Sequence, residues 1–422
     1  MSDSHISDLA AFITASPSSF HAAAEAARRL DAAGYARLEE TDAWPATAGR
    51  RYVVRDGAVI AWIQPEGLEA SAPFRIVGTH TDSPGFKLKP KPTTGAFGWL
   101  QAGVEVYGGP LLNSWLDREL ELAGRLVTTG GEQHLVRTGP YLRIPQLAVH
   151  LDRGANDGLR LDPQQHMNPV FGLGDVSSAD LVGHLAELAG IRGEDVAGYD
   201  ITVADTQQPA VFGRDGAFFA SGRMDNLVSV HSGLVALLAT PDTGEHVSVF
   251  AGFDHEEVGS ATRSGAAGSF LADILARISD GLGAGESDRL RAIAGSWCFS
   301  ADAGHSVHPN YPERHDPANR PVMGGGPLLK INAKQRYATD ATGAAEWARA
   351  CAQAGVAWQE FVSNNAVPCG STIGPLTATR LGIRTVDIGI PLLSMHSARE
   401  LAGVDDPGAL AAALGAFLAP VA

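Results

Sequence analysis

The stretch HVSVFAGFDHEEVGS (residues 246–260) joins an apolar run to two adjacent carboxylates, Glu256 and Glu257. The run predicts a buried strand, and a strand that ends on two acids can direct one at a metal ion and the other at a water molecule. Metal-assisted hydrolysis uses such a pair, with one acid as ligand and one as general base. Most Glu-Glu pairs lie on a solvated surface. A catalytic role for this pair is therefore supported only if similar segments occur elsewhere in the chain.

Four other segments share this pattern, in which an apolar run ends near a histidine or an acid. They are RIVGTHTDSPG (75–85) with His80, GRMDNL (222–227) with Asp225, GSWCFSADAGH (295–305) with Asp302, and RTVDIGIPLLSMHSARE (384–400) with His396. In an open α/β sheet, ligands bind in the crevice beyond the carboxyl ends of the strands. The segments therefore predict a composite metal site assembled from several strand ends.

The residue types narrow the choice of metal. Imidazole and carboxylate ligands without cysteine suit Zn, Mn or Co better than an iron–sulfur cluster or a structural cysteine-type zinc. With Glu257 the candidates number five, which is more than the three protein ligands of a single catalytic zinc. Two ions about 3.5–4 Å apart, sharing one bridging carboxylate, accommodate all of them.

Each candidate also has an ordinary structural explanation. His80 can be a hydrogen-bonded structural histidine, and Asp225 can cap the helix that follows it. Asp302 can close an Asx-turn, and His396 can be a simple loop residue. Asp82 can begin a turn, or it can accept the second ring N–H of His80 and so fix the tautomer of that histidine. Each explanation is common singly, but their coincidence at every strand end is rare.

Longer motifs surround these residues and follow one another from about residue 15 to about residue 410. They are HTDSPGFKLKP, GRMDNL, DHEEVGS, SADAGHSVHPNY, LKINAKQRYATD, NNAVPCGSTIGP and GIPLLSMHSARE. Together they resemble the M18 metallopeptidases, the aspartyl aminopeptidase family. The resemblance implies two divalent ions, zinc first and Mn or Co as alternatives, with Asp225 as the bridge and Glu256 as the general base. The implied ligands are His80, Asp225, Glu257, Asp302 and His396.

Composition excludes several classes of protein. No apolar run of the 422 residues reaches the roughly 20 that a membrane span needs, and MSDSHISDLAAFI lacks the features of a secretory signal. The three cysteines, Cys298, Cys351 and Cys369, have no CxxC spacing, which predicts reduced thiols and a cytoplasmic protein. The net charge of −15 argues against nucleic-acid binding and favours solubility.

The pattern of the chain changes twice. Over residues 1–92 and 221–422, alternating strand and helix patterns predict an α/β sandwich with a mostly parallel sheet. These include a Ser-capped helix at 18–34 and a hairpin turning at Asp56-Gly57. Residues 93–220 are β-rich, with one clear helix at 177–190. Since His80 precedes this block and the other ligands follow it, the catalytic domain is predicted to be discontinuous. The resemblance implies that the insertion is a dimerisation domain and that dimers build a homo-dodecamer.

Two further positions have both an ordinary and a functional interpretation. Lys330 interrupts the apolar LLKIN, so it points either into solvent or inward toward an anion. The resemblance implies that Lys330, with Tyr337 and His305 nearby, binds the side-chain carboxylate of an N-terminal Asp or Glu. His150, in LAVHLDR (147–153), is predicted to end a strand of the insertion. The resemblance implies that it reaches into the active site of a neighbouring subunit as a catalytic residue.

These observations favour a dinuclear metal-dependent aminopeptidase that prefers peptides with an N-terminal Asp or Glu. An aminopeptidase of broader, neutral-residue specificity is one alternative, and a related carboxypeptidase or deacylase is another. A non-catalytic scaffold or cargo protein is the third. Loss of Glu256 or of a ligand would favour the scaffold, and every expected residue is present.

Overall fold

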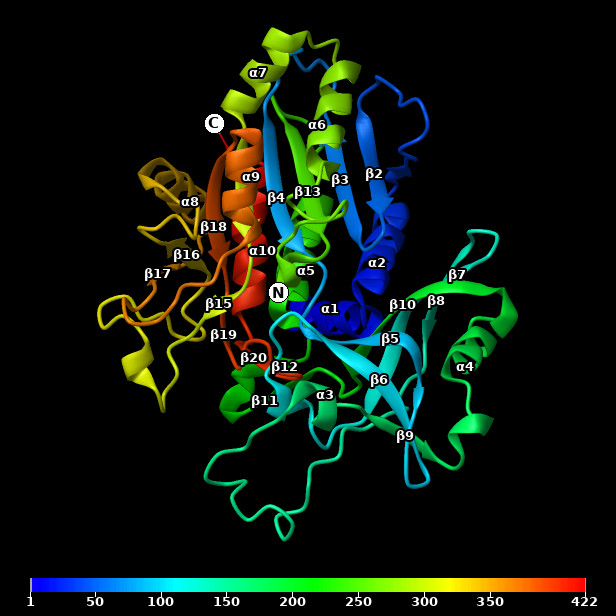
Figure 1. Ribbon diagram of the computed structural model, residues 1–422. Coiled ribbons are helices and arrows are strands. Elements are labelled where there is room, and N and C mark those ends of the chain that lie inside the picture. Colours follow the sequence, from blue (N-terminus) through cyan, green and yellow to red (C-terminus); the bar gives the residue numbers. More distant parts are fainter. Residues whose placement is uncertain (1, 422) are drawn as a thin grey trace.

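The computed structural model describes residues 2–421 and is built around a central sheet covered by helices on both faces (Figure 1). In spatial order the strands of this sheet are β1 (Ala36–Arg37), β2 (Gly49–Arg55), β3 (Ala58–Gln64), β13 (Val247–Phe253), β4 (Phe74–His80), β14 (Trp297–Ala301), β18 (Arg384–Gly389), β16 (Leu328–Ile331) and β17 (Gln359–Val362). Strands β13, β4, β14 and β18 run parallel to one another, whereas β3 and β16 join them antiparallel. The predicted α/β class is confirmed, and the sheet is parallel at its centre and mixed toward its edges.

Two apolar cores lie on opposite faces of this sheet. One face carries α1 (Ser2–Ala15), α2 (Ser19–Ala32), α5 (Met224–Ala239), α8 (Ala341–Ala354) and α10 (Asp406–Leu418). The other face carries α6 (Phe270–Gly281), α7 (Glu286–Gly295) and α9 (Ile373–Leu381). Strands β3 and β13 are buried at every position because both faces are covered, which explains their nearly continuous apolar runs. The Ser18 cap of α2 and the hairpin turn at Asp56-Gly57 are confirmed.

A second, antiparallel sheet packs beside the first one. Its strands in spatial order are β8 (Gln133–Arg137), β7 (Leu120–Thr128), β10 (Val196–Asp205), β5 (Gly85–Thr94), β6 (Trp99–Tyr107) and β9 (Val170–Leu173), accompanied by α3 (Pro163–His166) and α4 (Leu181–Leu188). The sheet thus begins at Gly85, before the predicted boundary at residue 93. The pairing register of β5 with β6 shifts between Leu88 and Thr93, where Pro90 and Pro92 lie. Such an irregularity accommodates residues that cannot donate to a ladder.

A third, smaller sheet was not predicted from the sequence. Its strands in spatial order are β11 (Ala210–Phe212), β12 (Phe218–Ser221), β20 (Glu400–Gly403), β19 (Pro391–Leu393) and β15 (Gly304–His305). Strand β12 leads into α5, which begins with Met224 and Asp225, and β20 follows His396 in the chain. Because β12 pairs with β20, this sheet brings the beginning of α5 close to the segment that carries His396.

Candidate active site

The predicted ligands gather at one edge of the central sheet. His80 is the last residue of β4, Asp302 directly follows β14, and Glu256 and Glu257 follow β13. These three strands run parallel and side by side, so their carboxyl ends open onto the same crevice. Asp225 lies in the first turn of α5 and joins His80 and Asp302 in this crevice. His80, Asp225 and Asp302 are all buried, as expected of side chains that face an enclosed site.

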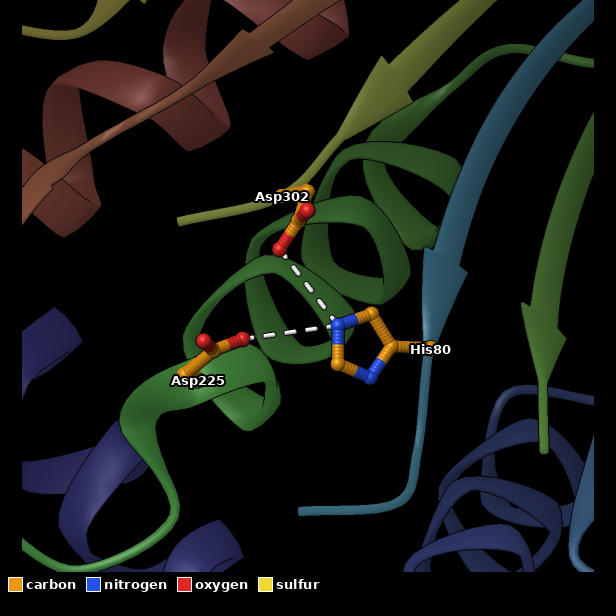
Figure 2. Close-up of side chains that lie close together, drawn as sticks. All are labelled: His80, Asp225 and Asp302. Atoms are coloured by element: carbon orange, nitrogen blue, oxygen red, sulfur yellow. Dashed lines mark hydrogen bonds and ion pairs between the residues drawn. The ribbon is translucent and has the colours of Figure 1, made fainter. Parts of the chain in front are cut away.

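Asp225 lies between two histidines. Its Oδ1 is 3.4 Å from Nε2 of His80, and its Oδ2 is 3.4 Å from Nε2 of His396. Asp302 Oδ1 is also 3.4 Å from the His80 nitrogen, and Figure 2 shows both carboxylates pointing at that atom. Glu257 Oε2 lies 3.5 Å from Nε2 of His396. The two oxygens of Asp225 therefore face two separate groups of side chains, which is the arrangement that a bridging carboxylate requires.

The donor atoms suit divalent metal ions. Three overlapping groups have ligand atoms within 4.8 Å of one another: His80, Asp225 and Asp302; His80, Glu256 and Glu257; and Asp225, Glu257 and His396. Asp225 Oδ1 is buried and accepts no hydrogen bond from any side chain or backbone group in residues 2–421. A buried carboxylate oxygen is normally satisfied, and an ion would satisfy this one. Imidazole and carboxylate donors in this number match the preferences of zinc and related ions.

The concentration of acids shifts several pKa values. Burial alone would lower the pKa of His80, but the nearby carboxylates of Asp225, Asp302 and Asp82 outweigh it and hold this pKa well above the ordinary value of 6.5. Burial and the neighbouring carboxylates raise the pKa of Glu257 well above its usual range. Burial also raises the pKa of Glu256 to about 7, although the positive charge of His80 opposes this shift. A glutamate with a pKa near neutrality can both accept and return a proton at physiological pH.

Asp82 lies beside the second ring nitrogen of His80. Nδ1 of His80 is 3.3 Å from Asp82 Oδ1 and 3.1 Å from the Asp82 backbone oxygen. The same carboxylate accepts the backbone N–H groups of Glu256 at 3.0 Å and Glu257 at 3.2 Å. Asp82 thus contacts a histidine on one strand end and orients the acidic turn after another. This second contact could not be foreseen because it joins residues more than 170 positions apart.

The sequence analysis missed Glu400, which is buried on β20. Its Oε2 accepts the backbone N–H of Asp225 and its Oε1 accepts the backbone N–H of His396, each at 2.9 Å. Burial and the charge of Asp225 raise the pKa of Glu400 to about 8. The only signal in the sequence was an acid four residues after His396, in a segment that otherwise reads as a short apolar strand.

A cavity of about 430 Å³ opens from the ligands toward Lys330, Tyr337 and His305. Lys330 points inward from β16 and is 1 % exposed, so the alternative of an outward, solvated lysine is wrong. Its Nζ donates to the backbone oxygen of Ala303 at 2.7 Å, lies 3.6 Å from Asp302 Oδ2 and stands 5.4 Å from the centre of the Tyr337 ring. The surrounding protein and the charge of Lys330 lower the pKa of His305, whose side chain remains accessible to solvent, so this histidine is neutral at pH 7.

His150 does not end a strand, so that prediction is wrong. It lies in an exposed, turn-rich stretch between β8 and α3, where residues 145–162 form no strand. The stretch LAVHL is largely apolar, but Leu147, Val149 and Leu151 are exposed and have no sheet to pack against. His150 is not among the residues that line the cavity of its own subunit.

Comparison with known proteins identifies the family. Residues 12–418 match the family model described as aminopeptidase I zinc metalloprotease (M18). The chain belongs to the M18 family of aminopeptidases. It is therefore related to metal-dependent hydrolases that act on peptides, and the carboxypeptidase and deacylase alternatives receive no support from this match.

Individual M18 relatives cover nearly the whole chain. A probable M18 family aminopeptidase 2 of Streptomyces coelicolor is 53% identical over 422 residues, spanning 99% of this chain and 98% of that protein. The cryo-EM structure of the Ape4 and Nbr1 complex contains a chain that is 34% identical, with a TM-score of 0.95 over 99% of this chain and 86% of that one. The Saccharomyces cerevisiae mApe1 dodecamer is 27% identical, with a TM-score of 0.86 over 98% of this chain and 95% of its own.

Within residues 2–421, none of the helices combines the length and apolar character that a membrane span requires.

Proposed function

We propose that this M18 enzyme releases N-terminal Asp and Glu residues from peptides at a centre of two zinc ions. The observation that carries the proposal is a single cavity lined both by two ligand groups that share Asp225 and by the buried Lys330. His80 and Asp302 would hold one ion, and Glu257 and His396 the other, with Asp225 shared between them. Ions bound there supply the Lewis acidity that polarises a peptide carbonyl and lowers the pKa of water.

Glu256 is suited to act as the general base. Its carboxylate lies in the cavity, 4.0 Å from Nε2 of His80, and its side chain is more exposed than those of His80, Asp225 and Glu257. As a carboxylate that is not needed to hold either ion, it can take a proton from the attacking water and return it to the leaving amine. Asp82 supports this role because it holds the backbone N–H of Glu256 and so fixes the direction of the side chain.

Lys330 is the basis for the proposed preference for acidic residues. A buried ammonium requires compensation, and a substrate carboxylate in the cavity would provide it. Ala303 and Asp302 occupy part of the Lys330 hydrogen-bonding capacity, but an ammonium has three donors. Neutral residues would leave the remaining donor unpaired, which is the physical origin of strong discrimination.

One observation favours the second candidate, an aminopeptidase of neutral-residue specificity. Lys330 Nζ lies 3.6 Å from Asp302 Oδ2, so the lysine can serve mainly to orient that ligand. In that case the cavity would accept side chains by shape, and Phe361 and Val367 of the adjoining pocket would contribute apolar surface.

The inserted sheet is proposed to mediate dimerisation, with the dimers assembling into a dodecamer, which is the state in which the mApe1 relative was solved. Exposed apolar side chains support this role: Phe97, Trp99 and Leu173 lie on or beside the paired strands β6 and β9. In such an assembly His150 would act on a neighbouring subunit. All three cysteines are free, which agrees with our proposal that the enzyme is cytoplasmic.

Activity on a panel of aminoacyl-p-nitroanilides, with Asp, Glu, Leu and Lys as the amino acid, tests the function. We expect about two zinc equivalents per subunit by mass spectrometry and the highest kcat/KM for the Asp and Glu substrates. A preference for Leu would establish the neutral-residue candidate instead. Absence of hydrolysis in the zinc-replete protein would overturn both.

A further inference from the structure

The second sheet reaches the candidate metal centre through Tyr107, the last residue of β6, and the residues after it, here called the 107–114 segment. The Tyr107 hydroxyl donates to Asp82 Oδ2 at 2.7 Å, and Asp82 is the carboxylate beside Nδ1 of His80. The Gly109 backbone oxygen lies 2.9 Å from Nδ1 of His396. The segment therefore contacts the outer ring nitrogen of His396 directly. It contacts the outer ring nitrogen of His80 through the Asp82 carboxylate.

Gly108, between these two contacts, approaches the acidic turn very closely. Its φ is +67°, and a Cβ at this position would lie 3.1 Å from Cβ of Glu257 and 3.2 Å from its backbone oxygen. A side chain here would therefore displace Glu257 or the segment itself. The glycine permits backbone-to-backbone contact between the second sheet and a candidate ligand.

The segment also holds the loop that carries His396. The Leu111 N–H donates to the backbone oxygen of His396 at 2.9 Å, and the Ala398 N–H donates to Ser114 Oγ at 2.8 Å. His396 has a φ of +66°, in the left-handed region that non-glycine residues rarely adopt. A loop in this conformation needs support from its surroundings, and the 107–114 segment supplies it.

We infer that the 107–114 segment is a positioning element of the metal centre, so that the inserted sheet fixes the orientation of both histidine ligands. The inference rests on the metal centre of the proposed function and adds a role for the insertion besides association. A group that orients an imidazole ligand through its second nitrogen usually contributes 10- to 100-fold to metal affinity. By linkage, metal binding must in turn strengthen the docking of the segment.

The first test compares zinc affinity in Tyr107→Phe and Tyr199→Phe, measured by competition with a chromophoric chelator. Tyr199 is a matched control because its hydroxyl also donates a 2.7 Å hydrogen bond, to the Lys89 backbone oxygen within the second sheet. We expect about tenfold weaker zinc binding in Tyr107→Phe and wild-type affinity in Tyr199→Phe. Equal affinity in all three proteins would overturn the inference. Wild-type protein that binds no zinc would overturn the proposed function, and the inference with it.

The second test uses only wild-type protein and so does not depend on the folding of a variant. Hydrogen exchange is followed with and without zinc. We expect zinc to slow exchange at the amides of Leu111 and Ala398, which join the segment to the His396 loop, by at least severalfold. The Arg143 and Val170 amides, which pair with each other far from the ligands, serve as internal controls. Unchanged exchange at Leu111 and Ala398 in zinc-loaded protein would overturn the inference.

Discussion

The Glu400 carboxylate accepts the backbone N–H of Asp225 at 2.9 Å with one oxygen and holds His396 in the same way with the other. We expect Glu400→Gln to weaken zinc binding by about 10- to 100-fold, because an amide can accept at only one of its two ends. The second N–H would then face an NH₂ group, and either Asp225 or His396 would shift. Zinc content after dialysis against graded chelator concentrations measures this loss.

Asp406→Asn is the matched control for Glu400→Gln. Asp406 is a buried carboxylate that accepts the N–H groups of Gly324 and Gly326 at 2.8 and 3.0 Å, and it does not line the catalytic cavity. We expect this variant to lower thermal stability while leaving zinc retention unchanged. Equal zinc loss in both variants would mean that Glu400 supports only the fold and has no specific role in holding Asp225 and His396.

Glu256→Gln tests the assignment of the base. The variant keeps the size of the side chain and leaves the metal ligands in place, so it should retain zinc and the native melting profile while kcat falls by about 10²–10⁴. Steady-state kinetics with parallel metal analysis provides the measurement. Near-normal turnover would remove Glu256 from the mechanism.

Asp225→Ala provides the contrast, since Asp225 contacts both candidate histidines. It should lose zinc together with activity. A variant that kept both ions would show that Asp225 does not bridge them.

The strand ends of the site were predictable because their signal is local. In β4 and β14 an apolar run stops next to His80 and Asp302, and a buried strand followed by a polar residue leaves few alternatives. The cap at Ser18 and the Asp56-Gly57 turn are local in the same way. Such features depend on neighbouring residues and so can be read before the fold is known.

The residues that hold the ligands were not predictable, because their contacts are long-range. Glu400 meets Asp225 across 175 positions, through the pairing of two four-residue strands that have no clear pattern of their own. Tyr107 meets Asp82 only because β5 and β6 form a hairpin that returns the chain to the site. His150 is the opposite case, since a largely apolar stretch predicted a strand where the chain forms an exposed loop.

Subunit mixing tests whether His150 acts across an interface. We expect His150→Ala and Glu256→Gln each to be impaired as pure assemblies, and a reassembled mixture to regain activity at interfaces that combine an intact His150 with an intact Glu256. If His150 donates a hydrogen bond to the developing oxyanion, its loss should cost about 2.7–4 kcal/mol in the activation free energy. Mass spectrometry of intact assemblies verifies mixing. Verified mixing without recovery would place His150 outside the reaction.

His21 should make stability depend on pH. Burial, with the charges of Arg137 and Arg223, lowers the pKa of His21 to about 4, whereas the unfolded chain has a value near 6.5. Its contribution is therefore fully present above pH 6.5 and is lost as the pH falls toward 4, by about 2 kcal/mol at pH 5.

Urea unfolding of wild type and His21→Gln at pH 7.5 and pH 5 measures this contribution. Gln cannot be protonated, and at this third helical position it can form a capping box with Ser18 at the start of α2. The variant should therefore lose less stability than wild type between the two pH values. Identical losses would exclude His21 as a source of the pH dependence.

Lys330→Met tests the acidic-substrate pocket. The methionine fills a similar volume without a charge, so kcat/KM for Asp and Glu substrates should fall at least about tenfold, or 1.4 kcal/mol. Leu substrates should be hydrolysed as well as by the wild type or better, because no buried charge would then remain unpaired. Since Lys330 also lies 3.6 Å from Asp302, zinc content is measured in the same samples.

Lys87→Met, which removes a half-buried lysine paired with Asp200 on the second sheet, is the control and should leave selectivity unchanged. An equal loss on Asp, Glu and Leu substrates, with or without loss of zinc, would show that Lys330 supports the site without selecting the substrate.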